Sequence, residues 1–383
     1  MRTWSLLALS VSVAWLLGAT VVDEQHDSGD KPKAPAGPKA PDGGAADVAA
    51  ETAARSPVGF VKGYTWGWTG QRGHYLGNAP AESMKHLAAT GAEWATIAFL
   101  GHMATRSTPE IKYGPGNPDM VSDGEIHRAV RLARQNKLKV ILKPVVDCRD
   151  GTWRAKIGFQ TTDGTPDEAA WARWWQSYES FLLHYARIAA ETKCELLCIG
   201  CEMMSTERFE ARWRGLAKKV RQVYPGPLVY NANHGGVGKI AWWDAVDIIG
   251  VSAYYPVGTK DDASVEAMVA SWKPVRAKLR RAAARFGRPV MFIELGVRSA
   301  RGCYRMPWDW QHRDLAYDGQ EQARYYEAAL RSFWDEPWFC GFSWWDWPAR
   351  LYKKEAADGN TSFCCYGKPA EKVLRTWYAK PRK

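Results

Sequence analysis

Apolar residues gather in short blocks along this chain, and polar residues separate the blocks. Eight of the blocks are rich in Val, Ile, Leu and aromatic residues with little polar alternation, a pattern typical of strands buried on both faces. These blocks cover residues 59–68, 94–100, 139–147, 195–203, 228–233, 246–255, 289–296 and 339–347. We therefore expect eight strands in one parallel sheet.

Amphipathic segments with the helical period fill most of the intervals between the strands. They cover residues 80–91, 123–137, 168–191, 207–224, 264–287 and 319–336, with a shorter one at 236–244 and an expected kink at Pro274. Eight strands alternating with helices predict an α/β protein, a (β/α)8 TIM barrel forming a single domain. The alternative is an open dinucleotide-binding sheet, but the turn "GYTWGWTGQRG" carries three bulky aromatics instead of a glycine-rich fingerprint.

The first 56 residues differ in composition from the rest. Residues 1–22 resemble a signal peptide, with Arg2, an apolar stretch and "LGA" as a cleavage site, although retention as a membrane anchor is an alternative. Residues 23–56 are rich in Pro, Ala, Gly and charge, which predicts a disordered linker. We expect a domain at 57–383 in a secreted, periplasmic or cell-envelope protein.

The formal charge of +11 changes this interpretation little, because the basic residues are scattered over helical faces such as "RAKLRRAAARFGR". We expect no nucleic-acid partner, a monomer, and membrane contact only through a retained anchor. The eight cysteines permit disulfides after export, but their pairing is not readable. Cys198 and Cys201 lie within one strand, where alternation directs them to opposite faces, and no second ligand pair is suitably spaced for zinc. No motif implies a cofactor or metal.

Glu202 and Glu294 each close an apolar block. A buried carboxylate has either a partner or a function, and catalytic residues of barrels lie at the carboxyl ends of strands. Strict alternation places Glu202 on the face of Gly200 and Glu294 on the face of Phe292, and we expect both faces to point inward. Two such carboxylates suit glycosidic cleavage, with retention at about 5–5.5 Å separation and inversion at about 6.5–9.5 Å. Structural ion pairs remain an alternative for each residue alone.

Other candidates lie near strand ends. Tyr254 could hydrogen-bond the nucleophilic carboxylate and keep it ionised. The chain has 21 tryptophans, and sugar rings stack on aromatic planes. Strand-end tryptophans such as Trp66 and Trp345 are therefore candidate sugar platforms, and Lys143 and Asn233 are candidate ligands of sugar hydroxyls. The expected partner is a polysaccharide or oligosaccharide.

Five motifs, "CIGCEMM", "VDIIGVSAYYP", "VMFIELGVRS", "GFSWWDW" and "YGKPAEKVLRTWY", resemble glycoside hydrolase family 113 of the retaining (β/α)8 clan. The resemblance spans residues 59–378. It implies that Glu202 is the acid/base, Glu294 the nucleophile and Tyr254 its hydrogen-bond partner. It also implies that Trp345 is the platform of the cleaved sugar, and that the reaction is endo-hydrolysis of β-1,4-linked mannan.

Two positions depart from the pattern of the clan. Cys201 stands where many relatives have Asn, and Val145 stands where we expect His. Both differences affect the expected identity of the substrate more than the expected type of reaction. The alternatives are therefore the same mechanism on xylan, β-glucan or an envelope polysaccharide, or a barrel that binds carbohydrate without cleaving it.

Overall fold

Eight parallel strands form a closed ring in the residues that this computed structural model describes, which are 55–383 except 261, 313 and 383. The strands pair in chain order, and β8 closes on β1. They are β1 (Val61–Trp66), β2 (Trp94–Met103), β3 (Lys139–Cys148), β4 (Leu196–Cys201), β5 (Leu228–Asn233), β6 (Ile248–Ser252), β7 (Val290–Leu295) and β8 (Phe339–Trp347). The predicted (β/α)8 barrel is confirmed. The predicted signal peptide at 1–22 and all but two residues of the predicted linker at 23–56 lie outside the described residues.

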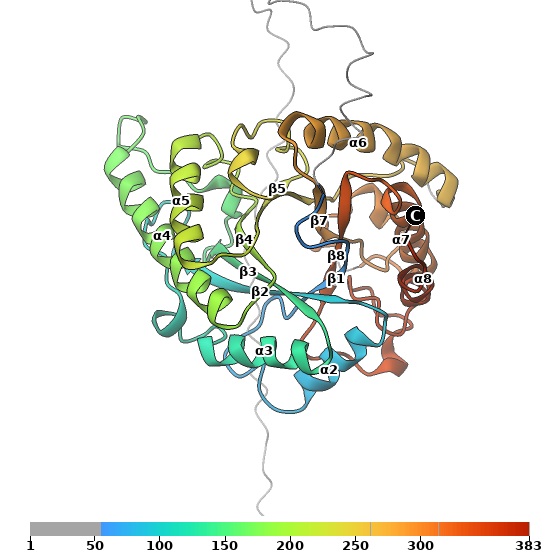
Figure 1. Cartoon of the computed structure of the whole chain (residues 1–383). Coiled ribbons are helices and arrows are strands. Elements are labelled where there is room, and N and C mark those ends of the chain that lie inside the picture. Colours follow the sequence, from blue (N-terminus) through green and yellow to red (C-terminus); the bar gives the residue numbers. More distant parts are fainter. Residues whose placement is uncertain (1–54, 261, 313, 383) are drawn as a thin grey trace, which may run out of the picture. The chain divides into compact units, whose positions relative to one another are not determined.

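Helices surround the ring of strands, which Figure 1 views end-on. The α-helices are α2 (Ala79–Ala88), α3 (Asp123–Gln135), α4 (Glu168–Glu191), α5 (Glu210–Val223), α6 (Val265–Phe286), α7 (Gly319–Phe333) and α8 (Pro369–Tyr378). Short 3-10 turns are η2 (Gly114–Gly116), η3 (Arg154–Lys156), η4 (Trp243–Ala245), η5 (Cys303–Arg305) and η6 (Lys354–Ala356). Helix α6 continues through Pro274.

Side chains fix where several helices begin. Ser122 and Glu125 form a capping box at α3, and the Asp167 side chain accepts a hydrogen bond from the Ala170 N–H at α4. The helix expected at 236–244 is absent from the described residues, and the turn η4 follows β5 there instead. The sequence "GVGK" opens this segment with two glycines, and glycine disfavours helix formation.

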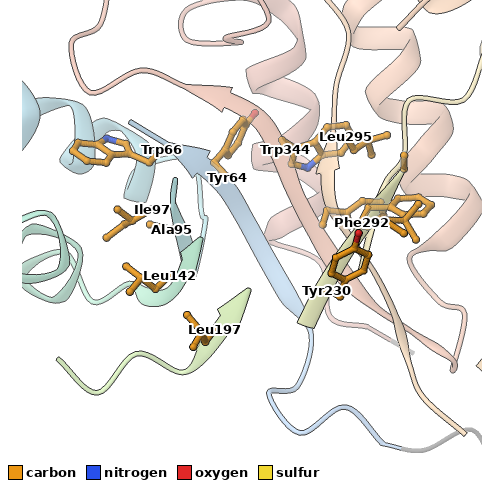
Figure 2. Close-up of a cluster of buried hydrophobic side chains, with 14 of the residues drawn as sticks. Tyr64, Trp66, Ala95, Ile97, Leu142, Leu197, Tyr230, Phe292, Leu295 and Trp344 are labelled. Atoms are coloured by element: carbon orange, nitrogen blue, oxygen red, sulfur yellow. The ribbon is translucent and has the colours of Figure 1, made fainter. Parts of the chain in front are cut away.

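Two apolar layers hold the barrel together. The outer layer lies between strands and helices, and Figure 2 shows part of it, with Trp66, Phe292 and Trp344 labelled. The inner layer takes side chains from every strand and fills the ring: Val61, Trp94, Ile141, Leu196, Cys198, Val229, Ile248, Met291, Ile293 and Cys340. The ring is therefore a packed core and not a pore, as is usual for this fold.

Buried polar side chains also lie in the strands. Ser343 of β8 hydrogen-bonds Thr65 of β1 at 3.2 Å and Thr96 of β2 at 2.8 Å. Ser252 of β6 donates to the amide oxygen of Asn231 of β5 at 3.2 Å. Because their polar atoms pair with one another, these residues are buried without a large desolvation cost.

All eight cysteines are buried free thiols in the structure, so the disulfides that export permits are not formed. Within the described part of the chain, no helix is both long and apolar enough to cross a bilayer.

Candidate active site

A β-bulge in β7 turns Glu294 into the barrel. Alternation would place Glu294 on the outward face of Phe292, which packs against Phe333 of α7. The pairing of β6 with β7 instead shifts register, so that Val251 faces Phe292 and Ser252 faces Glu294. Such an extra residue re-aims the side chains that follow it. Glu294 points inward as expected. The reason given for this expectation is wrong, because Phe292 does not share its face.

A second irregularity lies in β4. A Cβ on Gly200 would meet the Trp213 and Tyr230 rings at 2.8 Å, so position 200 faces outward. The register with β5 shifts between Cys198 and Cys201. Cys198 packs in the inner apolar layer, and the Cys201 thiol donates to Glu294, so both side chains face the inside of the barrel. The expected opposite faces for this pair are therefore wrong, because the bulge breaks the alternation on which they depend.

Glu202 follows β4 in a rare backbone conformation. Its φ is 52°, in the left-handed region that residues other than glycine seldom adopt. Its backbone N–H donates to the Asn231 carbonyl at 2.7 Å, which ties the turn to β5. Backbone strain of this kind persists where the surroundings enforce it, often at functional sites. Its side chain points toward Asn233 and Arg154, away from the face of Gly200.

Four donors surround the Glu294 carboxylate. The Lys143 ammonium, the Asn231 amide at 3.0 Å and the Cys201 thiol at 3.4 Å donate to Oε1. The Tyr254 hydroxyl donates to Oε2 at 3.2 Å. Donors of this kind favour the ionised form of a carboxyl group.

Glu202 has a different set of partners. The Arg154 guanidinium donates to Oε2 at 3.1 Å, and the Asn233 amide donates to Oε1 at 3.1 Å. Arg154 is itself held by Asp147 at 3.2 Å and by the Val146 carbonyl at 3.1 Å. The orientation of Glu202 is therefore fixed from two sides.

The two carboxyl groups titrate in opposite directions. Burial raises the pKa of Glu202, and the nearby Glu294 charge raises it further, against the opposing effect of Arg154. Burial alone would raise the pKa of Glu294 too, but the Lys143 and Arg154 charges lower it below its ordinary value. The surroundings thus favour a protonated carboxyl group at Glu202 beside an ionised one at Glu294, the pattern that separates acid from base at active sites.

Tyr254 lies two residues beyond β6 and turns inward, as expected from its position relative to Ser252. Burial raises the pKa of Tyr254 well above its usual range, and the Glu294 charge adds to this effect. The phenol therefore stays protonated and donates to Glu294. Its neighbour Tyr255 packs outward against Trp272.

Trp345 and Trp68 line the mouth of the barrel. Both side chains are half-buried, and their ring centroids lie 5.0 Å apart. The Lys143 ammonium lies 5.7 Å from the Trp345 ring, and the Arg154 guanidinium lies 5.8 Å from the Trp68 ring. The partners of both carboxylates thus contact this aromatic pair, which places an apolar surface beside them.

Two predicted substrate ligands need correction. Trp66 is fully buried outside the ring, where its indole N–H donates to Ser83 of α2 at 3.1 Å, so it is no sugar platform. Lys143 is also fully buried, and its ammonium pairs with Glu294, so it acts on the carboxylate instead of touching a sugar. Asn233 remains half-exposed beside Glu202.

Two further residues of the site, Asn231 and Arg154, escaped the prediction from sequence. Asn231 is a polar residue in the middle of an apolar strand, which was a readable signal. Arg154 lies in the 3-10 turn η3, where nothing in the local pattern identified its partners. Trp68 ends the first predicted strand block and was among the strand-end tryptophans expected near a sugar. The described residues contain no group of three or more His, Cys, Asp or Glu side chains arranged to hold a metal ion.

Comparison with known proteins agrees with this geometry. The model of Glycoside Hydrolase Family 113 matches residues 64–368. A family 113 β-mannanase from Alicyclobacillus acidocaldarius is 42% identical, with 84% of this chain and 97% of that chain covered and a TM-score of 0.76. A family 113 β-1,4-mannanase is 33% identical, with coverage of 84% and 100% and the same TM-score of 0.76.

More distant structures share only the fold. A β-glucuronidase from Faecalibacterium prausnitzii is 15% identical, with a TM-score of 0.55 over 84% of this chain and 49% of that chain. No curated protein matches the sequence. The family match covers most of the chain and confirms the resemblance of the motifs. The chain therefore belongs to glycoside hydrolase family 113.

Proposed function

We propose that this glycoside hydrolase cleaves β-1,4-linked mannan with retention of configuration, using Glu294 as nucleophile and Glu202 as acid/base. The observation that carries the proposal is the contrast between the partners of two buried carboxyl groups at the carboxyl ends of β4 and β7: the Lys143 ammonium pairs with Glu294, whereas Glu202 accepts from Arg154 and Asn233. The opposite directions of their pKa shifts follow from these surroundings. The choice of mannan is supported by the two solved family members described above as β-mannanases.

In the first step, the ionised Glu294 attacks the anomeric carbon, and the bond to the leaving sugar breaks. Lys143, Asn231, Cys201 and Tyr254 keep this carboxylate ionised and oriented until the attack. Glu202 transfers its proton to the departing oxygen, so the leaving sugar departs as an alcohol.

In the second step, Glu202, now ionised, removes a proton from water as the water attacks the same carbon. The ester bond to Glu294 breaks, and the sugar is released with its original configuration. Trp345 supplies the apolar surface on which the sugar ring of the cleaved bond rests, with Trp68 beside it.

The test compares hydrolysis of mannan by the wild type and by Glu294→Gln, which keeps the shape of the side chain but removes the nucleophile. Glu195→Gln is a matched control, because Glu195 precedes β4 at the opposite end of the strand, where it pairs with Arg134. We expect Glu294→Gln to lose essentially all turnover and Glu195→Gln to keep it. Full activity of Glu294→Gln would overturn the mechanism.

The polymer is tested separately on a panel of mannan, xylan and β-glucan with product sizing. Release of reducing sugar from mannan alone supports the proposed substrate. Release from another polymer keeps the mechanism and corrects the sugar. Binding without release from any polymer identifies a non-catalytic barrel.

We also propose that the protein is exported, on the basis of the apolar segment at 1–22. Fractionation of producing cells tests the proposal, and N-terminal sequencing separates cleavage near "LGA" from retention as an anchor. Recovery of the uncleaved chain in the cytoplasm would refute it.

A further inference from the structure

Helix α6 has a strongly basic surface on the outside of the ring of strands (Figure 1). Its 22 residues include six basic side chains, which are Lys273, Arg276, Lys278, Arg280, Arg281 and Arg285. With one acidic side chain, Glu266, the helix has a net charge of +5, against +11 for the whole chain. Five of the six basic residues are exposed, so most of this charge faces solvent.

The helical period brings several of these cations onto one face. Side chains three and four residues apart are neighbours on a helix, which places Lys273, Arg276 and Arg280 in one row with Arg281 beside it. From Lys273 to Arg281 the row covers about 12 Å, at a rise of about 1.5 Å per residue. The exposed Ala277 lies between the cations, so no bulky side chain fills the space among them.

A surface cavity of about 330 Å³ lies between this row and the turn that precedes β8. The four cations of the row and one carboxylate, Glu336, provide its charged lining. Glu336 already has partners, because its Oε1 pairs with Arg276 at 3.3 Å and its Oε2 accepts from the Trp338 indole N–H at 2.7 Å. The cavity therefore keeps an excess of positive charge, which attracts anions.

Helix α5 shows the contrasting case, in which basic residues are neutralised within the protein. Three of its cations form ion pairs: Arg214 with Asp244 at 2.8 Å, Lys219 with Glu179 at 2.7 Å, and Arg221 with Asp247 at 2.8 Å. On α6, no carboxylate in the part of the chain that the structure describes pairs with Lys273, Lys278 or Arg281. These three side chains are therefore available to an external anion.

The arrangement of the cations favours an extended anionic chain as their partner. Arginine and lysine bind carboxylates through charge-assisted hydrogen bonds, and a row of them suits a ligand with several carboxylates along its length. A helix that inserts into a membrane surface also exposes large apolar side chains. The described residues expose five such side chains, and none of them lies on α6.

We propose that this face of α6 binds a stretch of acidic polysaccharide, whose carboxylates pair with the cations around the cavity. A polysaccharide is favoured among polyanions because the chain is a glycoside hydrolase, which acts where such polymers lie. This binding goes beyond the function proposed above and does not depend on it.

The position of the cavity keeps the two activities apart. The cavity lies toward the amino ends of the strands, since α6 leads into β7 and Glu336 precedes β8. Glu202 and Glu294 lie at the carboxyl ends, so a polymer held on α6 leaves the mouth of the barrel open. It also raises the effective concentration of adjoining polysaccharide at the mouth.

The experiment measures binding of fluorescently labelled polygalacturonate by anisotropy, with fully methyl-esterified polygalacturonate as an uncharged probe of the same backbone. We expect the wild type to bind only the acidic form, with an affinity that falls as ionic strength rises. The combination of Lys273→Gln, Lys278→Gln and Arg281→Gln should weaken binding about tenfold. Glutamine has nearly the same helix propensity as lysine and arginine, so the helix is preserved.

The matched control combines Arg214→Gln, Lys219→Gln and Arg221→Gln on α5, which changes the net charge by the same amount. We expect it to bind within about twofold of the wild type, because these cations already pair with carboxylates. No binding by the wild type, or an equal loss in both triple variants, overturns the proposal. Binding to phosphatidylglycerol vesicles but not to polygalacturonate would assign this face to a membrane surface and would overturn it as well.

Discussion

Replacement of Lys143 by methionine isolates the electrostatic support of Glu294. The two side chains form an ion pair in which Lys143 has no exposed surface and Glu294 is nearly fully buried. Methionine preserves most of the volume of lysine, so the variant removes the charge and leaves little cavity. Glu294 then stays in the barrel without its cation.

The burial of this pair sets the expected magnitude. Removal of one partner from a buried ion pair costs about 3–5 kcal/mol of folding free energy, because it leaves an uncompensated charge in a region of low dielectric. The exposed pair of Lys219 and Glu179, with Nζ and Oε2 2.7 Å apart, is a matched control. Lys219→Met should cost no more than about 1 kcal/mol, since exposed pairs contribute little.

The sign of the pH dependence follows from the pKa of Glu294. In the wild type, folding lowers the pKa of Glu294. The ionised carboxylate therefore stabilises the folded state at any pH above the unfolded-state pKa. This stabilisation is lost as pH falls through the folded-state pKa. In Lys143→Met the largest charge that lowers this pKa is gone, so the folded-state pKa of Glu294 rises relative to the wild type. The folded variant then binds more protons than the folded wild type in the acid range, and its deficit in stability shrinks as pH falls.

Urea denaturation of both proteins across the acid range measures these quantities. Adding Glu294→Gln to Lys143→Met removes the unpaired charge and should recover part of the loss, which a double-mutant cycle quantifies. A loss under about 1 kcal/mol for Lys143→Met, or a loss that is the same at every pH, would refute this reasoning.

Two further substitutions test the roles of single groups. Glu202→Gln should slow mannan cleavage about 10²–10⁴-fold and remove the alkaline limb of the pH profile, because the group that must be protonated is gone. Glu207→Gln is its control, since burial raises the pKa of Glu207 to about 7 although the Tyr230 hydroxyl donates to it. We expect Glu207→Gln to keep the alkaline limb. Loss of the limb in Glu207→Gln would assign the acid to Glu207 instead. Tyr254→Phe removes one hydrogen bond to Glu294 and should raise the activation barrier by about 1.5–3 kcal/mol, seen in kcat/KM with the fold retained. An unchanged kcat/KM would show that the phenol does not support the carboxylate.

Much of the fold was predictable because strands buried on both faces read as apolar blocks. The blocks gave the order of β1–β8, and the carboxyl ends of β4 and β7 located both glutamates. The prediction of a short helix at 236–244 was wrong, because the apolar spacing there is offset by glycines that disfavour a helix.

The details of the site were less accessible, since they depend on features that span strands. The bulges that turn Glu294 and Cys201 inward arise from pairing with neighbouring strands, which no periodicity within one strand reveals. Trp66 and Trp345 both lie near strand ends, yet only Trp345 faces the mouth. Arg154 reaches Glu202 from the turn η3, 48 residues away in sequence, and such a long-range contact leaves no local signal.

Identification of the residue that bonds covalently to the sugar tests the central claim most directly. A 2-deoxy-2-fluoro-mannosyl substrate with a good leaving group slows the second step and accumulates the glycosyl-enzyme, which mass spectrometry of peptides can locate. We expect the label on Glu294. Attachment to any other residue, or inverted product released with no labelled intermediate, would contradict the assignment.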